Sequence, residues 1–211
     1  MAVLTEKQIK YGFDYYHKDD ARPKSVVEVS EYDGEDKLII NCTQLDENYS
    51  AKDKKRILQE WCSFLVEHPD IFTELMFCTR MPQELFDAVC AQRRLKRLHI
   101  KWGVYPDILK LENLQELEYL HIGSGRSVSS LEPISRLVNL VALSIENFQQ
   151  IDDYAPLANL KHLESLALEG DFAAPKILKV QSLEFLRHMK QLHFFSFLTA
   201  KVIDKDYSPI L

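Results

Sequence analysis

Short apolar runs with the spacing L-x-x-L-x-[LIF] recur along the last two-thirds of the chain. They begin at residues 72, 95, 117, 140, 163 and 192, so the first four steps are 22 or 23 residues long and the last is 29. Two of the runs, LKRLHI and LEYLHI, also share a His before the final Ile. Within each run the fourth and sixth positions are apolar, as in a β-strand that buries one face. The regular steps predict one short strand in each of six repeats.

The segments between these runs carry apolar residues at steps of three and four, which is the spacing of a helix with one buried face. Four of them have a proline near their start, where the first helical turn needs no N–H donor. One strand and one helical turn cannot bury an apolar face alone, so we expect the repeats to stack into a solenoid with a continuous core. The segments are 82–94, 105–116, 131–139, 154–162 and 183–191, and the prolines are Pro82, Pro106, Pro133 and Pro156.

The phrases LEPISRLVNLVALSI (131–145) and YAPLANLKHLESLAL (154–168) follow the rhythm L-x-P-L-x-x-L-x-x-L-x-x-L-x-L. On these residues the chain resembles the leucine-rich repeat proteins, with repeats in the style of the bacterial internalins, over residues 70–200. The resemblance implies an α/β leucine-rich repeat solenoid, with a parallel β-sheet on its concave face and short helices on its convex face. The family's usual turn Asn, three residues after the last apolar position of each strand motif, is replaced here by Arg80, Gly103, Gly125, Phe148, Asp171 and Ala200, so we expect more variable turns.

Residues 1–69 are predicted to form an N-terminal α/β cap, because a solenoid must cover the core and the strand edge at its ends. Within the cap, residues 25–42 indicate a β-hairpin that turns at Asp33-Gly34, with KLIIN beside the first repeat strand. A helix is predicted over residues 49–68, with Ser50 at its N-terminus.

The leucine-rich repeats are expected over residues 70–203, followed by a tail at 204–211. The long last step predicts an insertion loop at 171–180. The aromatic final strand and the tail sequence YSPIL are expected to close the C-terminal end of the stack.

Alternation along each repeat strand points the third, fifth and seventh positions of the motif away from the core. At these positions the second strand carries basic residues and a His, the third a Tyr and a His, and the next two small residues that end in Glu. Arg and aromatic side chains near the middle of a concave sheet are typical of protein-binding surfaces, although a solvated sheet face also carries charges. We therefore predict that the chain binds another protein through Arg97, His99, Lys101, Trp102, Tyr119, His121, Glu146 and Glu169.

His99 and His121 take the same position on neighbouring strands, about 5 Å apart at the backbone. Two imidazoles at this spacing could share a metal ion, with Cys78 or Met76 as a further ligand, or serve an enzymatic step. No carboxylate at the right place and no CxxC pair supports a metal, and no GxSxG, HExxH or dinucleotide fingerprint occurs. The simpler interpretation is two solvent-facing histidines within a binding surface, with no cofactor and no catalysis.

The net charge of −6 gives no electrostatic reason to expect binding to nucleic acid or to an anionic membrane. The start, MAVLTEKQIKYGF, lacks the apolar segment of a secretory signal, and no apolar run approaches the length of a transmembrane helix. Four cysteines without CxxC pairing indicate reduced thiols in a cytoplasmic protein. These features favour a cytoplasmic binding protein, for instance an inhibitor or an immunity protein that neutralises a toxin. A structural scaffold subunit is the alternative, and the sequence sets neither the partner nor the oligomeric state.

Overall fold

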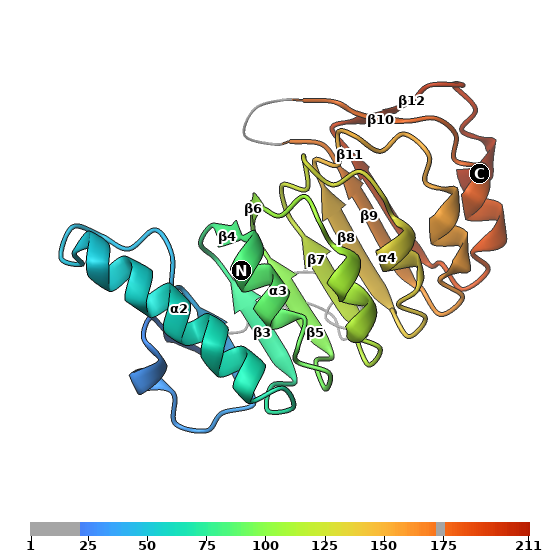
Figure 1. Cartoon of the computed structure of the whole chain (residues 1–211). Coiled ribbons are helices and arrows are strands. Elements are labelled where there is room, and N and C mark those ends of the chain that lie inside the picture. Colours follow the sequence, from blue (N-terminus) through green and yellow to red (C-terminus); the bar gives the residue numbers. More distant parts are fainter. Residues whose placement is uncertain (1–21, 172–175) are drawn as a thin grey trace.

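One parallel sheet, with eight strands in the part of the chain that the structure describes, runs through the protein (Figure 1). The structure, a computed structural model, describes residues 22–171 and 176–211. Every neighbouring pair in the sheet is parallel, in the order β1-β2-β3-β5-β7-β8-β9-β11. The strands are β1 (Lys24–Val26), β2 (Lys37–Ile40), β3 (Glu74–Phe77), β5 (Arg97–Ile100), β7 (Tyr119–Ile122), β8 (Ala142–Glu146), β9 (Ser165–Glu169) and β11 (Phe194–Leu198).

The six predicted repeat strands are β3, β5, β7, β8, β9 and β11, and they lie in register. The first core leucine of β3, Leu75, pairs in turn with Leu98, Leu120, Leu143 and Leu166. None of these five side chains is more than 2% exposed. Because each repeat adds one apolar side chain to the same row, the core is continuous along the stack, as the repeat spacing predicted.

Short helical segments cover the convex face of the sheet (Figure 1). Only the first is an α-helix of about two turns, whereas three of the others are single 3₁₀ turns, since few residues separate the strands. Pro133 and Pro156 lie in the first turn of two of them, as expected. The segments are α3 (Gln83–Val89), η4 (Leu109–Asn113), α4 (Glu132–Ser135), η5 (Ala155–Asn159) and η6 (Glu184–His188).

A longer helix, α2 (Ala51–Glu67), lies at the N-terminal end of the stack (Figure 1). Its N-cap is Ser50, whose hydroxyl oxygen accepts a hydrogen bond from the Asp53 N–H at 3.2 Å, as predicted. Trp61 is fully buried and its Nε1 donates to the Val27 carbonyl oxygen at 2.8 Å, which ties the helix to the chain after β1. Residues 1–21 of the predicted cap lie outside the described residues.

The predicted hairpin at residues 25–42 is wrong, because β1 and β2 pair in parallel. Gly34 does turn the chain, with a φ of 97°, but it belongs to a longer connection. That connection includes the 3₁₀ helix η3 (Val29–Glu31), which packs against α2 and returns the chain to the start of β2. The placement of KLIIN beside the first repeat strand is confirmed, since β2 pairs with β3.

The C-terminal part differs from the prediction, and small strand pairs lie outside the main sheet. The expected insertion loop contains a strand, β10 (Leu178–Val180), which pairs in parallel with β12 (Ala200–Val202). A second small pair, β4 (Met81–Pro82) with β6 (Gly103–Val104), lies near the N-terminal repeats. The tail ends in the 3₁₀ helix η7 (Ser208–Ile210), and Leu211 stays fully exposed. None of the helices in residues 22–171 and 176–211 has the length and apolar character needed to cross a bilayer.

Candidate functional site

The strand register arranges the outward side chains of the sheet in rows. The predicted site residues Arg97 and Tyr119 are direct neighbours in one row, and His99 and His121 are direct neighbours in the next. The first row reads Lys37, Glu74, Arg97, Tyr119, Ala142, Ser165 and Phe194, and the second reads Ile39, Met76, His99, His121, Ser144, Ala167 and Ser196.

The first row begins with three charged side chains, Lys37, Glu74 and Arg97, and the aromatic Tyr119 follows them. The Lys37 Nζ lies 3.9 Å from a carboxylate oxygen of Glu74, which is only 2% exposed. One strand further, the Arg97 guanidinium carbon lies 5.4 Å from the centroid of the Tyr119 ring, within the range of a cation–π interaction. The Arg97 side chain is therefore held over an aromatic face, and less side-chain entropy remains to be lost if a ligand binds there.

His99 and His121 stack face to face in the second row. Their ring centroids are 4.2 Å apart and their planes differ by 13°. The Nδ1 of His121 lies 3.0 Å from the Ser144 hydroxyl, so the neighbouring strand also holds this ring. Burial lowers the pKa of His99 to about 3, aided by the nearby His121 and Lys101, and burial lowers the pKa of His121 to about 4. Both rings are therefore neutral at pH 7. Both are also half-buried, whereas the sequence had indicated solvent-facing histidines.

The remaining predicted residues lie toward the carboxyl ends of the strands. Glu146 and Glu169 face each other in register at the ends of β8 and β9, and burial raises the pKa of Glu169. Trp102 follows β5 in a bend, half-buried, and its carbonyl oxygen accepts a hydrogen bond from the Met81 N–H at 2.9 Å. Lys101 is exposed, whereas the other predicted site residues are half-buried. The structure thus brings the eight residues onto four neighbouring strands and the bend after one of them.

The geometry gives no support to a metal centre at the two histidines. Stacked imidazole rings point their nitrogen lone pairs outward in nearly parallel planes, so the pairs do not converge on one ion. Cys78 is free, and burial raises the pKa of its thiol, which disfavours the thiolate that binds metal. Within residues 22–171 and 176–211, no three His, Cys, Asp or Glu side chains gather where they could hold a metal ion.

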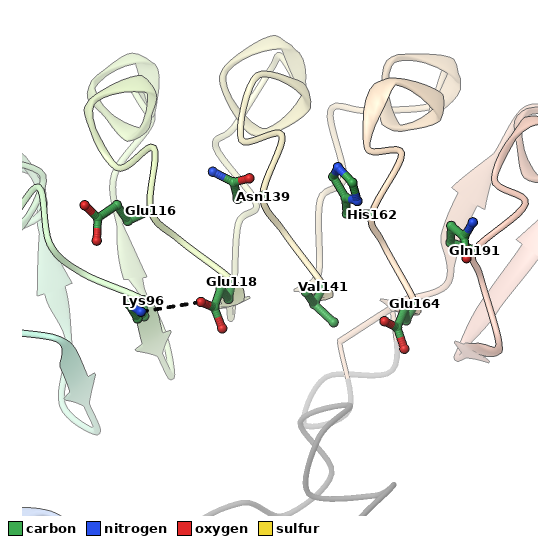
Figure 2. A pocket seen from close by; sticks show the side chains of 8 residues that line it. All are labelled: Lys96, Glu116, Glu118, Asn139, Val141, His162, Glu164 and Gln191. Atoms are coloured by element: carbon green, nitrogen blue, oxygen red, sulfur yellow. Dashed lines mark ion pairs between the residues drawn. The ribbon is translucent and has the colours of Figure 1, made fainter.

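A groove at the amino ends of the strands was not predicted (Figure 2). Its volume is about 440 Å³. It is formed by the residues that flank the first leucine of successive repeats, and Lys96 and Glu118 form an ion pair of 3.8 Å across it. The sequence signal was present, because these positions also recur with the repeat period. The lining residues are Lys96, Glu116, Glu118, Asn139, Val141, His162, Glu164 and Gln191.

Comparison with known proteins identifies the fold of this chain through solved structures. No protein-family model and no curated protein sequence matches the chain. Internalin C2 from Listeria monocytogenes strain 4b F2365 is similar over 82% of this chain and 62% of its own, with 21% identity and a TM-score of 0.50. An internalin (inlF) from the same strain is similar over 66% of this chain and 44% of its own, with 20% identity and a TM-score of 0.47. The chain thus spans less than two-thirds of either structure. From the likeness to internalin C2 and the six in-register strands, the chain has the leucine-rich repeat fold of the internalins.

Proposed function

We propose that the protein binds another protein, without catalysis, through the concave side of its sheet. The observation that carries this proposal is a pair of neighbouring rows. In one row Arg97 lies over the Tyr119 ring, and in the next His99 stacks on His121. We call these four residues, together with Lys101, Trp102, Glu146 and Glu169, the concave strip. These side chains project from paired strands of a rigid sheet, and not from loops, so their positions are set before a partner arrives.

The composition of this strip supports protein recognition more than recognition of a small molecule. Arg, Tyr and Trp are the residue types that most often dominate the binding energy of protein interfaces. The strip combines Arg97, Tyr119 and Trp102 with the exposed Lys101, and Glu146 and Glu169 lie at the ends of the next two strands. Its basic and acidic groups are therefore separated, which would favour one orientation of a partner over others.

A narrower role is inhibition, for instance as an immunity protein that neutralises a toxin in the cytoplasm. Its support is the net charge of −6, which would speed association with a basic target. Such a target would be a cationic protein whose own active surface is masked in the complex.

The proposal is tested by recovering a partner with the intact protein and measuring its affinity for variants. We expect Arg97→Glu with Tyr119→Ala to weaken binding at least about tenfold, because the charge is reversed and the ring beneath it is lost. Arg136→Glu is the matched control, since Arg136 is exposed and pairs with Glu112 among the convex segments. Circular dichroism melts would establish that each variant is folded. An affinity unchanged in the double variant would show that the partner binds elsewhere.

A further inference from the structure

The two ends of the solenoid differ in how completely their apolar core is covered. At the N-terminal end α2 covers the stack, and Trp61 and Leu65 on its inner face are fully buried. At the C-terminal end Phe195 and Phe197 of β11 take the core positions of the motif but remain half-buried. Their neighbours in register on β9, Leu166 and Leu168, are 0% exposed. The last rung therefore leaves part of its apolar side uncovered by any of the described residues.

The outer edge of β11 also presents backbone groups. The Phe194 N–H donates to the Glu164 carbonyl oxygen at 3.1 Å, and the Leu198 carbonyl oxygen accepts from the Gly170 N–H at 2.9 Å. These residues point their backbone groups toward β9, and the alternation of a strand then points those of Phe195 and Phe197 outward. Within the part of the chain that the structure describes, no strand pairs with this edge.

Natural proteins usually protect such an edge with charged residues, prolines or bulges. The sequence of β11, FFSFL, has no charge and no proline, and Leu198 is 58% exposed. Further apolar side chains follow, among them Ile203 at 40% and Tyr207 at 43% exposure. An uncharged edge that none of the described strands covers, beside exposed apolar surface, has the character of an interface.

We propose that β11 pairs with β11 of a second copy of this chain, in an antiparallel arrangement about a two-fold axis at Ser196. In this register the outward backbone groups of Phe195 exchange hydrogen bonds with those of Phe197 of the second copy. The two Ser196 residues then form a non-hydrogen-bonded pair with Cα atoms about 4.5 Å apart. The eight-stranded sheets of the two copies become one continuous sheet.

The strand is suited to pairing with itself. With the axis at Ser196, every cross-strand pair joins apolar to apolar or Ser to Ser, so no like charges meet. Head-to-tail pairing of β11 with β1 of another copy is less suitable. Lys24 of β1 forms ion pairs with Asp33 and Glu35 beside that edge, and these would have to be desolvated. Two-fold pairing closes the assembly at a dimer, whereas head-to-tail pairing would continue into filaments.

Cysteine cross-linking tests the register. In Ser196→Cys the two cysteines would face each other across the axis. Their Cα atoms would be at a separation within the range of a disulfide. We expect the variant, made in the whole 211-residue chain, to form a disulfide-linked dimer under mild oxidation, with most of the protein linked. Ala167→Cys is the matched control, because Ala167 pairs with Ser196 one strand further in. Its two thiols would be about 14 Å apart, three strand spacings, and should stay unlinked.

Sedimentation of the parent chain tests the assembly itself. We expect a monomer–dimer equilibrium that Ser196→Asp shifts at least about tenfold toward monomer, because two carboxylates would face each other across the axis. A parent chain that remains monomeric at millimolar concentration would overturn the proposal. So would a dimer that is unaffected by Ser196→Asp, or a Ser196→Cys variant that links no better than Ala167→Cys. Larger species growing with concentration would indicate head-to-tail pairing instead.

Discussion

At the scale of single residues, the stacked histidines give the protein a dependence on pH. The pKa of His99 is lowered from 6.5 to about 3 and that of His121 to about 4, so the folded protein keeps both rings neutral. Between about pH 6.5 and 4 the unfolded chain binds protons that the folded chain does not bind. The free energy of unfolding should therefore fall as the pH is lowered through this window, by up to about 1.4 kcal/mol per pH unit for each histidine.

Carboxylates titrate in the same window, so the contribution of the histidines is read from a difference between variants. Chemical unfolding of the parent and of His99→Asn with His121→Asn, at pH 7 and pH 4.5, should show a smaller loss of stability in the variant. His162→Asn is the control, because His162 is exposed on the other side of the repeat leucine and should leave the loss unchanged. Equal pH dependence in all three proteins would contradict the buried, neutral pair.

Gly123 cannot be replaced by a larger residue without a steric clash. A Cβ atom built there would lie 1.8 Å from the Lys101 carbonyl oxygen, which is backbone and cannot rotate away. The Gly123 carbonyl also accepts the hydrogen bond of the buried Tyr105 hydroxyl. We expect Gly123→Ala to lower the free energy of unfolding by at least about 2 kcal/mol in urea titrations. Ser129→Ala, in an exposed loop, should change it by no more than about 0.5 kcal/mol.

At this scale the sequence predicted positions better than contacts. Alternation in the repeat motif correctly placed Arg97 beside Tyr119 and His99 beside His121, because the register of a stacked sheet follows from the repeat length. The stacking of the imidazoles could not be predicted in the same way. It depends on side-chain rotamers and on the hydrogen bond between His121 and Ser144, neither of which has a sequence period.

At the scale of elements, the N-terminal helix depends on its cap. Ser50 accepts the hydrogen bond of the Asp53 N–H, one of the donors that the first turn of α2 leaves without an intrahelical partner. We expect Ser50→Ala to lower the free energy of unfolding by about 1 kcal/mol. Ser63→Ala, at an exposed position within the same helix, should be neutral or slightly stabilising because Ala is the better helix former. Thermal and urea unfolding of the two variants would separate capping from general loss of a hydroxyl.

The elements also show where local signals mislead. The helix was predicted from its cap and apolar face, both of which are local, and it is confirmed. The hairpin was predicted from Asp33-Gly34, which is also local, yet the pairing of β1 with β2 depends on where the connection travels. That connection is long enough to hold η3 and to cross over, and its contact with α2 is a tertiary feature that the dipeptide does not encode.

At the scale of the whole molecule, the repeat period was sufficient to predict the architecture. Each repeat contributes one strand, one buried row and one helical turn, so the fold follows from a single spacing. The groove lined by Lys96, Glu118 and their equivalents follows from the same spacing, but only after the first leucine is known to lie at the amino end of each strand. The final strand and the tail were expected to close the C-terminal end. The tail helix η7 does contact η6, and Arg187 donates a hydrogen bond to the Ser208 hydroxyl. The half-burial of Phe195 and Phe197 on the final strand was not predicted.

The last prediction concerns how burial changes along the stack. Phe77 on β3 and Phe197 on β11 occupy the same position of the motif, but Phe77 is 1% exposed and Phe197 is half-buried at the open end. Phe77→Ala should lower the free energy of unfolding by about 3–5 kcal/mol. Phe197→Ala should cost about half as much when unfolding is measured at protein concentrations that keep the chain monomeric, because less apolar surface is lost from the core.

The same pair of variants distinguishes a closed end from an open one. If the tail covered β11, Phe197 would be packed on both sides and the two losses would be equal. If a second copy covers β11, the cost of Phe197→Ala should rise toward that of Phe77→Ala as the protein concentration is raised, since stability then includes the interface. If the loss of stability in Phe197→Ala is small at every protein concentration, nothing covers β11 in solution. The fully buried part of the core then ends at β9.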